Sequence, residues 1–276
     1  MKTTPITLLL CLFCTLSFSG QSKAQKLYAD LGLNSQYFNY EEQNNEGVML
    51  NREEGYLNGG TIAIGYKPTM DTEWRLSHER LYGSVDYDGL TQNGSMLHTQ
   101  TEEEISLFSI RFKQSLGEVY GIPGLNWFVS TALNHRHWDR DIQATSMSLG
   151  LSENYSWNEF DLSIETNYKL SSKNIMIAQI GFAIGFNEKI EVDLHKIGAG
   201  KPSFNLGDIK GKHVNFGYQR LLGDASSLSV SLTYQYWHFD RSGDHSITTG
   251  PRRITISEPE SDTHQAGIYM QYRSAF

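Results

Sequence analysis

The chain ends in GIYMQYRSAF, Gly267–Phe276, and this stretch decides the fold class. Apolar or aromatic residues alternate with others along it, at Ile268, Met270, Tyr272 and Phe276. Successive side chains of a β-strand point to opposite faces, so these four residues share one face. The stretch therefore predicts a strand with one apolar face that ends on an aromatic residue.

The same period of two recurs along the chain, whereas helical periodicity is scarce. It is clear in WNEFDLSIETNYKL (157–170), IGFAIGF (180–186) and SLSVSLTYQYW (227–237). A soluble sandwich buries its apolar faces, whereas a small membrane barrel turns them outward and packs its polar faces in the lumen. Charges of both signs on the polar faces suit such a hydrogen-bonded interior; they are Asp30, Arg75, Arg111, Asp161, Glu165, Lys169 and Arg273.

The terminal strand resembles the sorting signal of bacterial outer-membrane barrels, whose last strand ends in an aromatic residue. The resemblance implies an all-β, antiparallel up-and-down transmembrane barrel in the outer membrane of a Gram-negative cell. It also implies contact with outer-membrane lipid and lipopolysaccharide, and recognition by the barrel-assembly machinery through the strand ending at Phe276.

Ten strands are predicted, near residues 26–40, 56–67, 72–88, 102–114, 124–139, 153–170, 174–190, 210–221, 226–239 and 263–276. Long polar loops, such as EEQNNEGVMLNREEG (41–55), follow the odd strands, and short turns follow the even ones. This alternation suits an even strand number, with long outer loops and short periplasmic turns. We expect an outer aromatic girdle at Tyr37, Tyr82, Trp138 and Tyr236.

Residues 1–24 predict a secretory signal, with an early Lys2, an apolar core and a small-x-small site before residue 25. The apolar run is too short to span a membrane. Residues 25–276 then form a single barrel domain without cysteine, because Cys11 and Cys14 both precede it. Loss of Lys2 and Lys23 takes the formal net charge from −8 to about −10, which argues against nucleic acid as a partner.

Function is expected at the outer mouth, because a ten-stranded lumen is narrow enough to be filled by side chains. Even positions of the first strand face inward, which places Glu42 in the mouth. Odd positions of the seventh strand face inward, and EVDLHK continues them with Glu191, Asp193 and His195. The first and seventh strands thus predict acids and an imidazole at the mouth.

Two further acids, in SVDYDG, complete the expected cleft. Asp86 and Asp88 face inward if a bulge near residues 78–80 shifts the phase set by Trp74 and Leu76. They would then face the acid–imidazole pair that follows the seventh strand.

This arrangement resembles that of the omptins, ten-stranded outer-membrane proteases with an Asp-x-Asp pair in the second outer loop and an Asp-x-His pair in the fourth. The resemblance implies an endopeptidase in which His195 is the general base and Asp193 orients it. Asp86 and Asp88 would hold the attacking water and the peptide.

The same resemblance implies that Glu42 and Glu191 hold a basic side chain of the peptide substrate. It implies no cofactor and no metal, although omptins depend on lipopolysaccharide. DYDG also lacks the twelfth-position glutamate of an EF-hand calcium loop. His135 and His137 are predicted to face outward at the rim, near lipid head groups.

Other functions remain open from the sequence. Asp193 and His195 are equally compatible with an ordinary solvated loop. A non-enzymatic barrel, acting as an adhesin, a scaffold or an assembly partner through its long outer loops, is one alternative. A narrow channel for small solutes is another.

Overall fold

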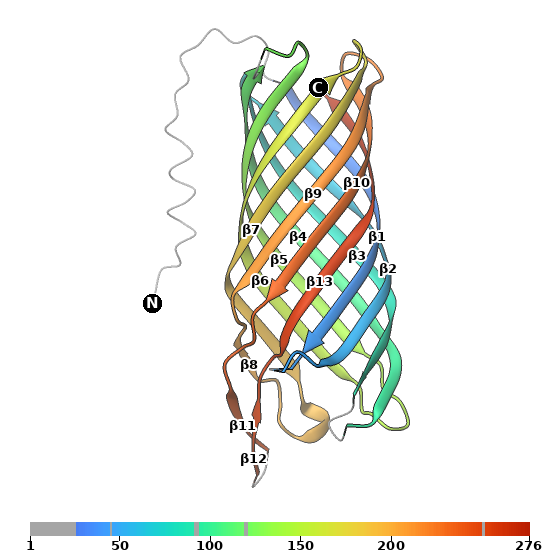
Figure 1. Cartoon of the computed structure of the whole chain (residues 1–276), viewed down its shortest axis with the longest axis vertical. Helices are drawn as coiled ribbons and strands as arrows, with labels where there is room; N and C mark the ends of the chain where they lie inside the picture. Colours follow the sequence, from blue (N-terminus) through green and yellow to red (C-terminus); the bar gives the residue numbers. More distant parts are fainter. Residues whose placement is uncertain (1–25, 45, 91–93, 119–120, 250–251) are drawn as a thin grey trace.

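Ten long antiparallel strands close into a barrel (Figure 1). The computed structural model describes residues 26–276, except 45, 91–93, 119–120 and 250–251, so the predicted signal segment lies outside the described residues. The barrel strands are β1 Lys26–Gln43, β2 Met49–Lys67, β3 Thr72–Leu90, β4 Met96–Glu118, β5 Leu125–Ile142, β6 Leu151–Lys169, β7 Asn174–Asp193, β9 Ile209–Leu221, β10 Ser226–Phe239 and β13 Glu260–Ala275. Their order is β6-β5-β4-β3-β2-β1-β13-β10-β9-β7, and pairing of β6 with β7 closes the ring, which confirms the predicted fold class.

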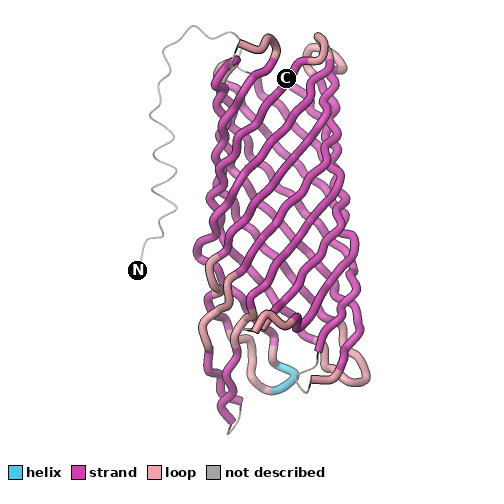
Figure 2. The backbone as a smooth tube through the Cα atoms, in the orientation of Figure 1, coloured by secondary structure: helices cyan, strands magenta, loops and turns pink. Residues whose placement is uncertain are grey.

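Among the described residues, three short strands and one 3-10 helix lie at the outer end of the barrel. β8 (Ser203–Asn205) pairs with the end of β7, which leads into η1 (His195–Ile197). β11 (His245–Thr249) and β12 (Arg252–Ile256) pair only with each other. This β11–β12 pair, the outer hairpin, projects beyond the barrel at the end opposite the C-terminus (Figure 2).

The outside of the barrel carries an apolar band. Large hydrophobic side chains are exposed on it, and they include Leu33, Ile62, Ile180, Phe216 and Leu232. Such a band is the surface that a barrel presents to lipid. Among the described residues, no helix has the length and apolarity to cross a membrane.

The strands continue beyond this band toward the outer end, so the first outer loop is shorter than predicted. Residues 41–55 were expected to be loop, but β1 reaches Gln43 and β2 starts at Met49. The additional strand residues at the ends of β1 and β2 are joined inside the barrel, where the Asn51 side chain donates a hydrogen bond of 2.6 Å to Glu42.

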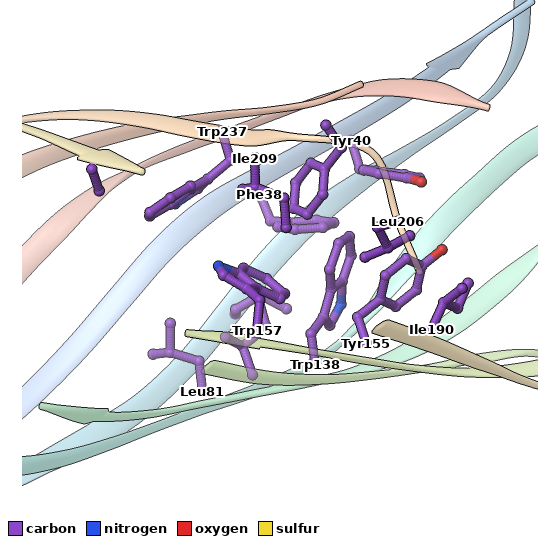
Figure 3. Close-up of a cluster of buried hydrophobic side chains, with 14 of the residues drawn as sticks. Phe38, Tyr40, Leu81, Trp138, Tyr155, Trp157, Ile190, Leu206, Ile209 and Trp237 are labelled. Atoms are coloured by element: carbon purple, nitrogen blue, oxygen red, sulfur yellow. The ribbon is translucent and has the colours of Figure 1, made fainter. Parts of the chain in front are cut away.

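An aromatic core fills the outer half of the lumen (Figure 3). Trp138 stacks on Tyr155 with ring centroids 4.9 Å apart, and Trp157 meets Phe239 edge-on at 5.3 Å. Trp138 is only 2% exposed, so its predicted place in the outer girdle is wrong. Even positions face inward at this end of β5, and this parity places Trp138 in the lumen.

Ion pairs fill the part of the lumen nearer the termini. Asp30 is buried between Arg75, at 3.0 Å, and Arg273, at 2.7 Å. Lys113 pairs with Glu165 at 2.5 Å. Paired, hydrogen-bonded charges are the form in which a narrow interior tolerates ionised groups. The polar, hydrogen-bonded packing expected of the lumen is therefore found in this half, whereas the outer half is largely aromatic.

A bulge in β7 reverses the inward-facing parity of that strand. Asn187 takes a left-handed conformation with φ 58°, and the pairing register with β6 shifts between Ser156 and Asn158. Before the bulge Ala183 faces the lumen, and after it Ile190 does. Even positions, not odd ones, therefore face inward at the outer end of β7.

The bulge gives a test of backbone strain at Asn187. We expect Asn187→Val to lower the unfolding free energy by about 1–2 kcal/mol, because a β-branched residue is strained in the left-handed region. Asn187→Gly should be tolerated, since glycine adopts this conformation freely. Urea unfolding in lipid vesicles measures both, and equal destabilisation by Val and Gly would contradict the assignment.

Candidate functional site

The predicted acid pair of β3 lies on the outside of the barrel. Pairing of β3 with β4 runs without a register shift from Thr72 to Leu90, so the bulge expected near residues 78–80 is absent from that stretch. Tyr87 is buried inside, whereas Asp86 and Asp88 are exposed. The predicted inward orientation of both acids is wrong. Even-numbered residues face outward at the start of β3, and because the strand has no bulge they also face outward at its end.

The residues at the end of β7 also point away from the lumen. The bulge at Asn187 turns Val192 inward, so that Glu191 is exposed and Asp193 faces outward beside it. Lys201 lies on the same side, with its Nζ 3.4 Å from Asp193 Oδ2. The predicted inward orientation of Glu191 and Asp193 is therefore wrong.

Asp193 and His195 nevertheless form a pair. Asp193 Oδ1 lies 2.8 Å from His195 Nδ1 and accepts the His195 backbone N–H at 3.0 Å. These two hydrogen bonds lower the pKa of Asp193 to about 2, and the bond from the backbone N–H has the larger effect. The carboxylate can thus orient the imidazole, and His195, the first residue of η1, is exposed.

The two acid-containing pairs face away from the lumen on different walls of the barrel. β4, β5 and β6 lie between β3 and β7 in the ring, and Asp86, Asp88 and Asp193 all point outward. Asp88 instead forms a pair with His98 on the neighbouring β4. The catalytic roles implied for Asp86, Asp88, Asp193 and His195 stay a prediction without a common site to support it.

Glu42 faces the mouth, as predicted. Its carboxylate accepts hydrogen bonds from Tyr40, at 2.7 Å, and from Asn51, and it lies 3.3 Å from Arg140 Nη1. The resemblance assigned Glu42 to the basic side chain of a substrate. In this structure Arg140 of the same chain supplies a basic side chain there.

Arg140 is the centre of a buried group that the sequence reasoning missed. Its Nη2 lies 2.6 Å from Glu53 Oε1, its Nη1 2.6 Å from Glu153 Oε2, and its Nε 3.8 Å from Glu103 Oε1. We call Arg140 and its carboxylate partners Glu42, Glu53, Glu103 and Glu153 the Arg140 cluster. It joins five strands across the outer mouth.

The Arg140 cluster closes the mouth above the aromatic core. The guanidinium carbon lies 4.4 Å from the centroid of the Tyr40 ring, and Trp138 packs beside it. Strand parity was the signal that could have found the cluster, had Glu53 and Arg140 been read as strand. Among the described residues, no group of three or more His, Cys, Asp or Glu side chains is arranged to hold a metal ion.

Comparisons with known proteins agree with this architecture. No family model and no curated protein matches the sequence. Among solved structures, the outer membrane protease OmpT from Escherichia coli is similar, with a TM-score of 0.60 and 8% identity over 95% of this chain and 99% of that one. OprG from Pseudomonas aeruginosa matches at TM-score 0.42 and 8% identity, over 92% and 97% of the two chains. The NalP translocator domain from Neisseria meningitidis matches at 0.43 and 7%, over 97% and 94%.

At such identity the similarity to OmpT is one of fold. A closed ten-stranded barrel with an apolar outer band is the form in which a chain spans the outer membrane. The protein is an outer-membrane β-barrel.

Cysteine labelling tests the orientation of the predicted site residues. We expect Glu191→Cys to react with a water-soluble maleimide in intact vesicles and Val192→Cys to be protected, because only the first side chain faces outward. Since Cys11 and Cys14 both precede the barrel domain, the background is clean if that segment is absent. Reaction of Val192→Cys with protection of Glu191→Cys would restore the inward-facing site.

Loss of the central cation tests the Arg140 cluster. We expect Arg140→Leu to lower the unfolding free energy at neutral pH by about 3–5 kcal/mol, because it leaves buried carboxylates without a counter-ion. Arg80→Leu is the matched control: Arg80 pairs with Glu104 on the exposed wall, so its loss should change stability little. Equal effects of the two variants in urea unfolding would contradict a structural role for the cluster.

Proposed function

We propose that this chain is a sealed, non-enzymatic outer-membrane barrel that acts through its outer loops as a surface adhesin or scaffold. The observation that carries the proposal is the Arg140 cluster, which fills the mouth where a solute or a peptide would enter. Because its acids and its cation are buried against each other, the mouth presents no open polar groove to a substrate.

The outer surface above the seal is built from the loops. The outer hairpin extends beyond the barrel rim (Figure 1), and Ser246, Arg253 and Thr255 are exposed on it. The segment between β7 and β9 contacts it through β8, where Phe204 stacks on His245 with ring centroids 4.5 Å apart. A rigid barrel that carries projecting loops is suited to bind a macromolecule outside the cell.

A channel is less well supported. The aromatic core and the ion pairs occupy the lumen from the outer mouth to the end near Asp30. Water-filled conduction needs an open path along the axis, which small barrels with packed interiors lack.

Peptidase activity is the second candidate. It is favoured by the fold shared with OmpT and by the 2.8 Å contact between Asp193 and His195. It requires an acid pair and this imidazole to face one bound peptide, whereas Asp86 and Asp88 point outward four strands away. The sealed scaffold therefore accounts for more of the geometry.

Two assays on the refolded protein with lipopolysaccharide separate the three functions. We expect no steady conductance in planar bilayers, and no cleavage of a dibasic fluorogenic peptide above that of the His195→Ala variant. A barrel of known conductance, refolded and inserted in the same way, shows that the bilayer assay detects an open lumen.

Either signal from the unaltered protein would reject the proposal. Steady conductance would identify a channel. Peptide cleavage that His195→Ala abolishes would identify a peptidase.

A further inference from the structure

Glu258 brings a fifth carboxyl group to the sealed mouth. It lies between the outer hairpin and β13, and its side chain is buried, with the residue only 6% exposed. The Tyr155 hydroxyl lies 2.5 Å from Glu258 Oε1. A loop residue thus reaches the edge of the Arg140 cluster.

The backbone of Glu258 holds the base of the outer hairpin. Its N–H donates to the Ser242 hydroxyl at 2.8 Å, and the Ser242 N–H donates to the Glu258 carbonyl at 3.0 Å. Ser242 precedes β11 and Glu258 follows β12, so the two bonds close the hairpin at its root. The Glu258 side chain therefore helps to hold the hairpin at the rim of the mouth, together with the stacking of His245 on Phe204.

Hydrogen-bond donors are too few at this point for two ionised carboxylates. Tyr155 has one hydroxyl proton, yet its oxygen lies 3.1 Å from Glu153 Oε2 as well as 2.5 Å from Glu258. Arg140 donates to the same oxygen at 3.0 Å. In the described part of the chain Glu258 has no ion-pair partner, so its ionised form would be buried without a counter-ion.

Acids outnumber cations around Glu258. Arg140 is the one cation of the buried group, and Arg241, at the base of the hairpin, contacts Asp244 and Ser257 instead. The titratable groups packed at the mouth come from β1, β2, β3, β4, β5 and β6, and they are Tyr40, Glu42, Glu53, Tyr87, Glu103, Arg140, Glu153 and Tyr155. Burial is the main cause that holds the pKa of Glu258 well above its usual range, and the carboxylates of Glu153 and Glu42 add to it. Tyr155 and Arg140 act in the opposite direction. The neutral form is the one that fits the site.

We propose that Glu258 is a proton-dependent latch that holds the outer hairpin at the rim of the mouth while its carboxyl group is protonated and releases the hairpin when it ionises. The latch is independent of what the outer loops bind. It goes beyond the scaffold role, because it makes the presentation of those loops depend on the pH outside the cell.

The direction of the pH dependence follows from the raised pKa. A carboxyl group that titrates higher in the folded state than in water contributes stability at low pH, and it loses that contribution as pH rises through the folded pKa. The hairpin should therefore be held in acid and released in alkali. The protonated fraction of Glu258 falls about tenfold for each pH unit above its pKa.

Paired spin labels measure this movement in the intact barrel. Thr255→Cys places one label on the hairpin, and Glu102→Cys places the other on the exposed wall of β4. We expect one narrow distance at about pH 5. At about pH 10, about one pH unit above the highest documented values for buried carboxyl groups, the population at that distance should fall about tenfold.

Three variants in the doubly labelled protein assign the movement to Glu258. Glu258→Gln, which mimics the neutral carboxyl, should stay held at both pH values, and Glu258→Ala should be released at both. Glu260→Gln changes a nearby exposed acid and should keep the full pH response. Circular dichroism of the barrel should be the same for all of them.

Two outcomes overturn the latch. The first is a distance between the two labels that stays the same at both pH values in the protein with native Glu258. It would mean that ionisation does not move the hairpin. The second is a pH response that persists in Glu258→Gln, which means that another group controls it.

Discussion

The hydrogen bonds between β6 and β7 close the sheet, and the rest of the structure depends on that closure. Lipid offers no partner for a backbone N–H or C=O group, so a sheet can cross a membrane only without free edges. Closure divides every strand into residues that face lipid and residues that face a narrow lumen. The apolar band, the lumenal ion pairs and the aromatic core all follow from this division.

The lumen shows how the chain accommodates its inward-facing polar residues. Near the termini, acids and bases are paired, as in the contacts of Asp30 with Arg75 and Arg273. At the outer mouth four carboxylates share the single guanidinium of Arg140, and Glu258 adds a fifth acid. Buried charge is tolerated there only with a counter-ion or with a proton. The proposed seal and the proposed latch both start from this group of five acids around one guanidinium.

The site residues illustrate where strand parity is reliable. It placed Glu42 correctly, because β1 is regular up to the residue in question. It failed for Glu191 and Asp193, because one extra residue at Asn187 exchanges the two faces of β7. It failed for Asp86 and Asp88 in the opposite way, since a bulge was assumed in β3 and the strand is regular there. Bulges leave little trace in the composition of a strand, so the inward-facing positions before a bulge do not predict those after it.

The sequence alone determined the class of fold, the strand number and the polar, filled lumen, because alternation and turn spacing are local properties that every strand repeats. Only the tertiary structure decided which acids meet. Arg140 gathers Glu153 from the neighbouring β6 and Glu42 and Glu53 from the more distant β1 and β2, and the bulge at Asn187 turns Asp193 outward. Such encounters depend on register and on the sum of small backbone shifts around the ring, neither of which a single strand records.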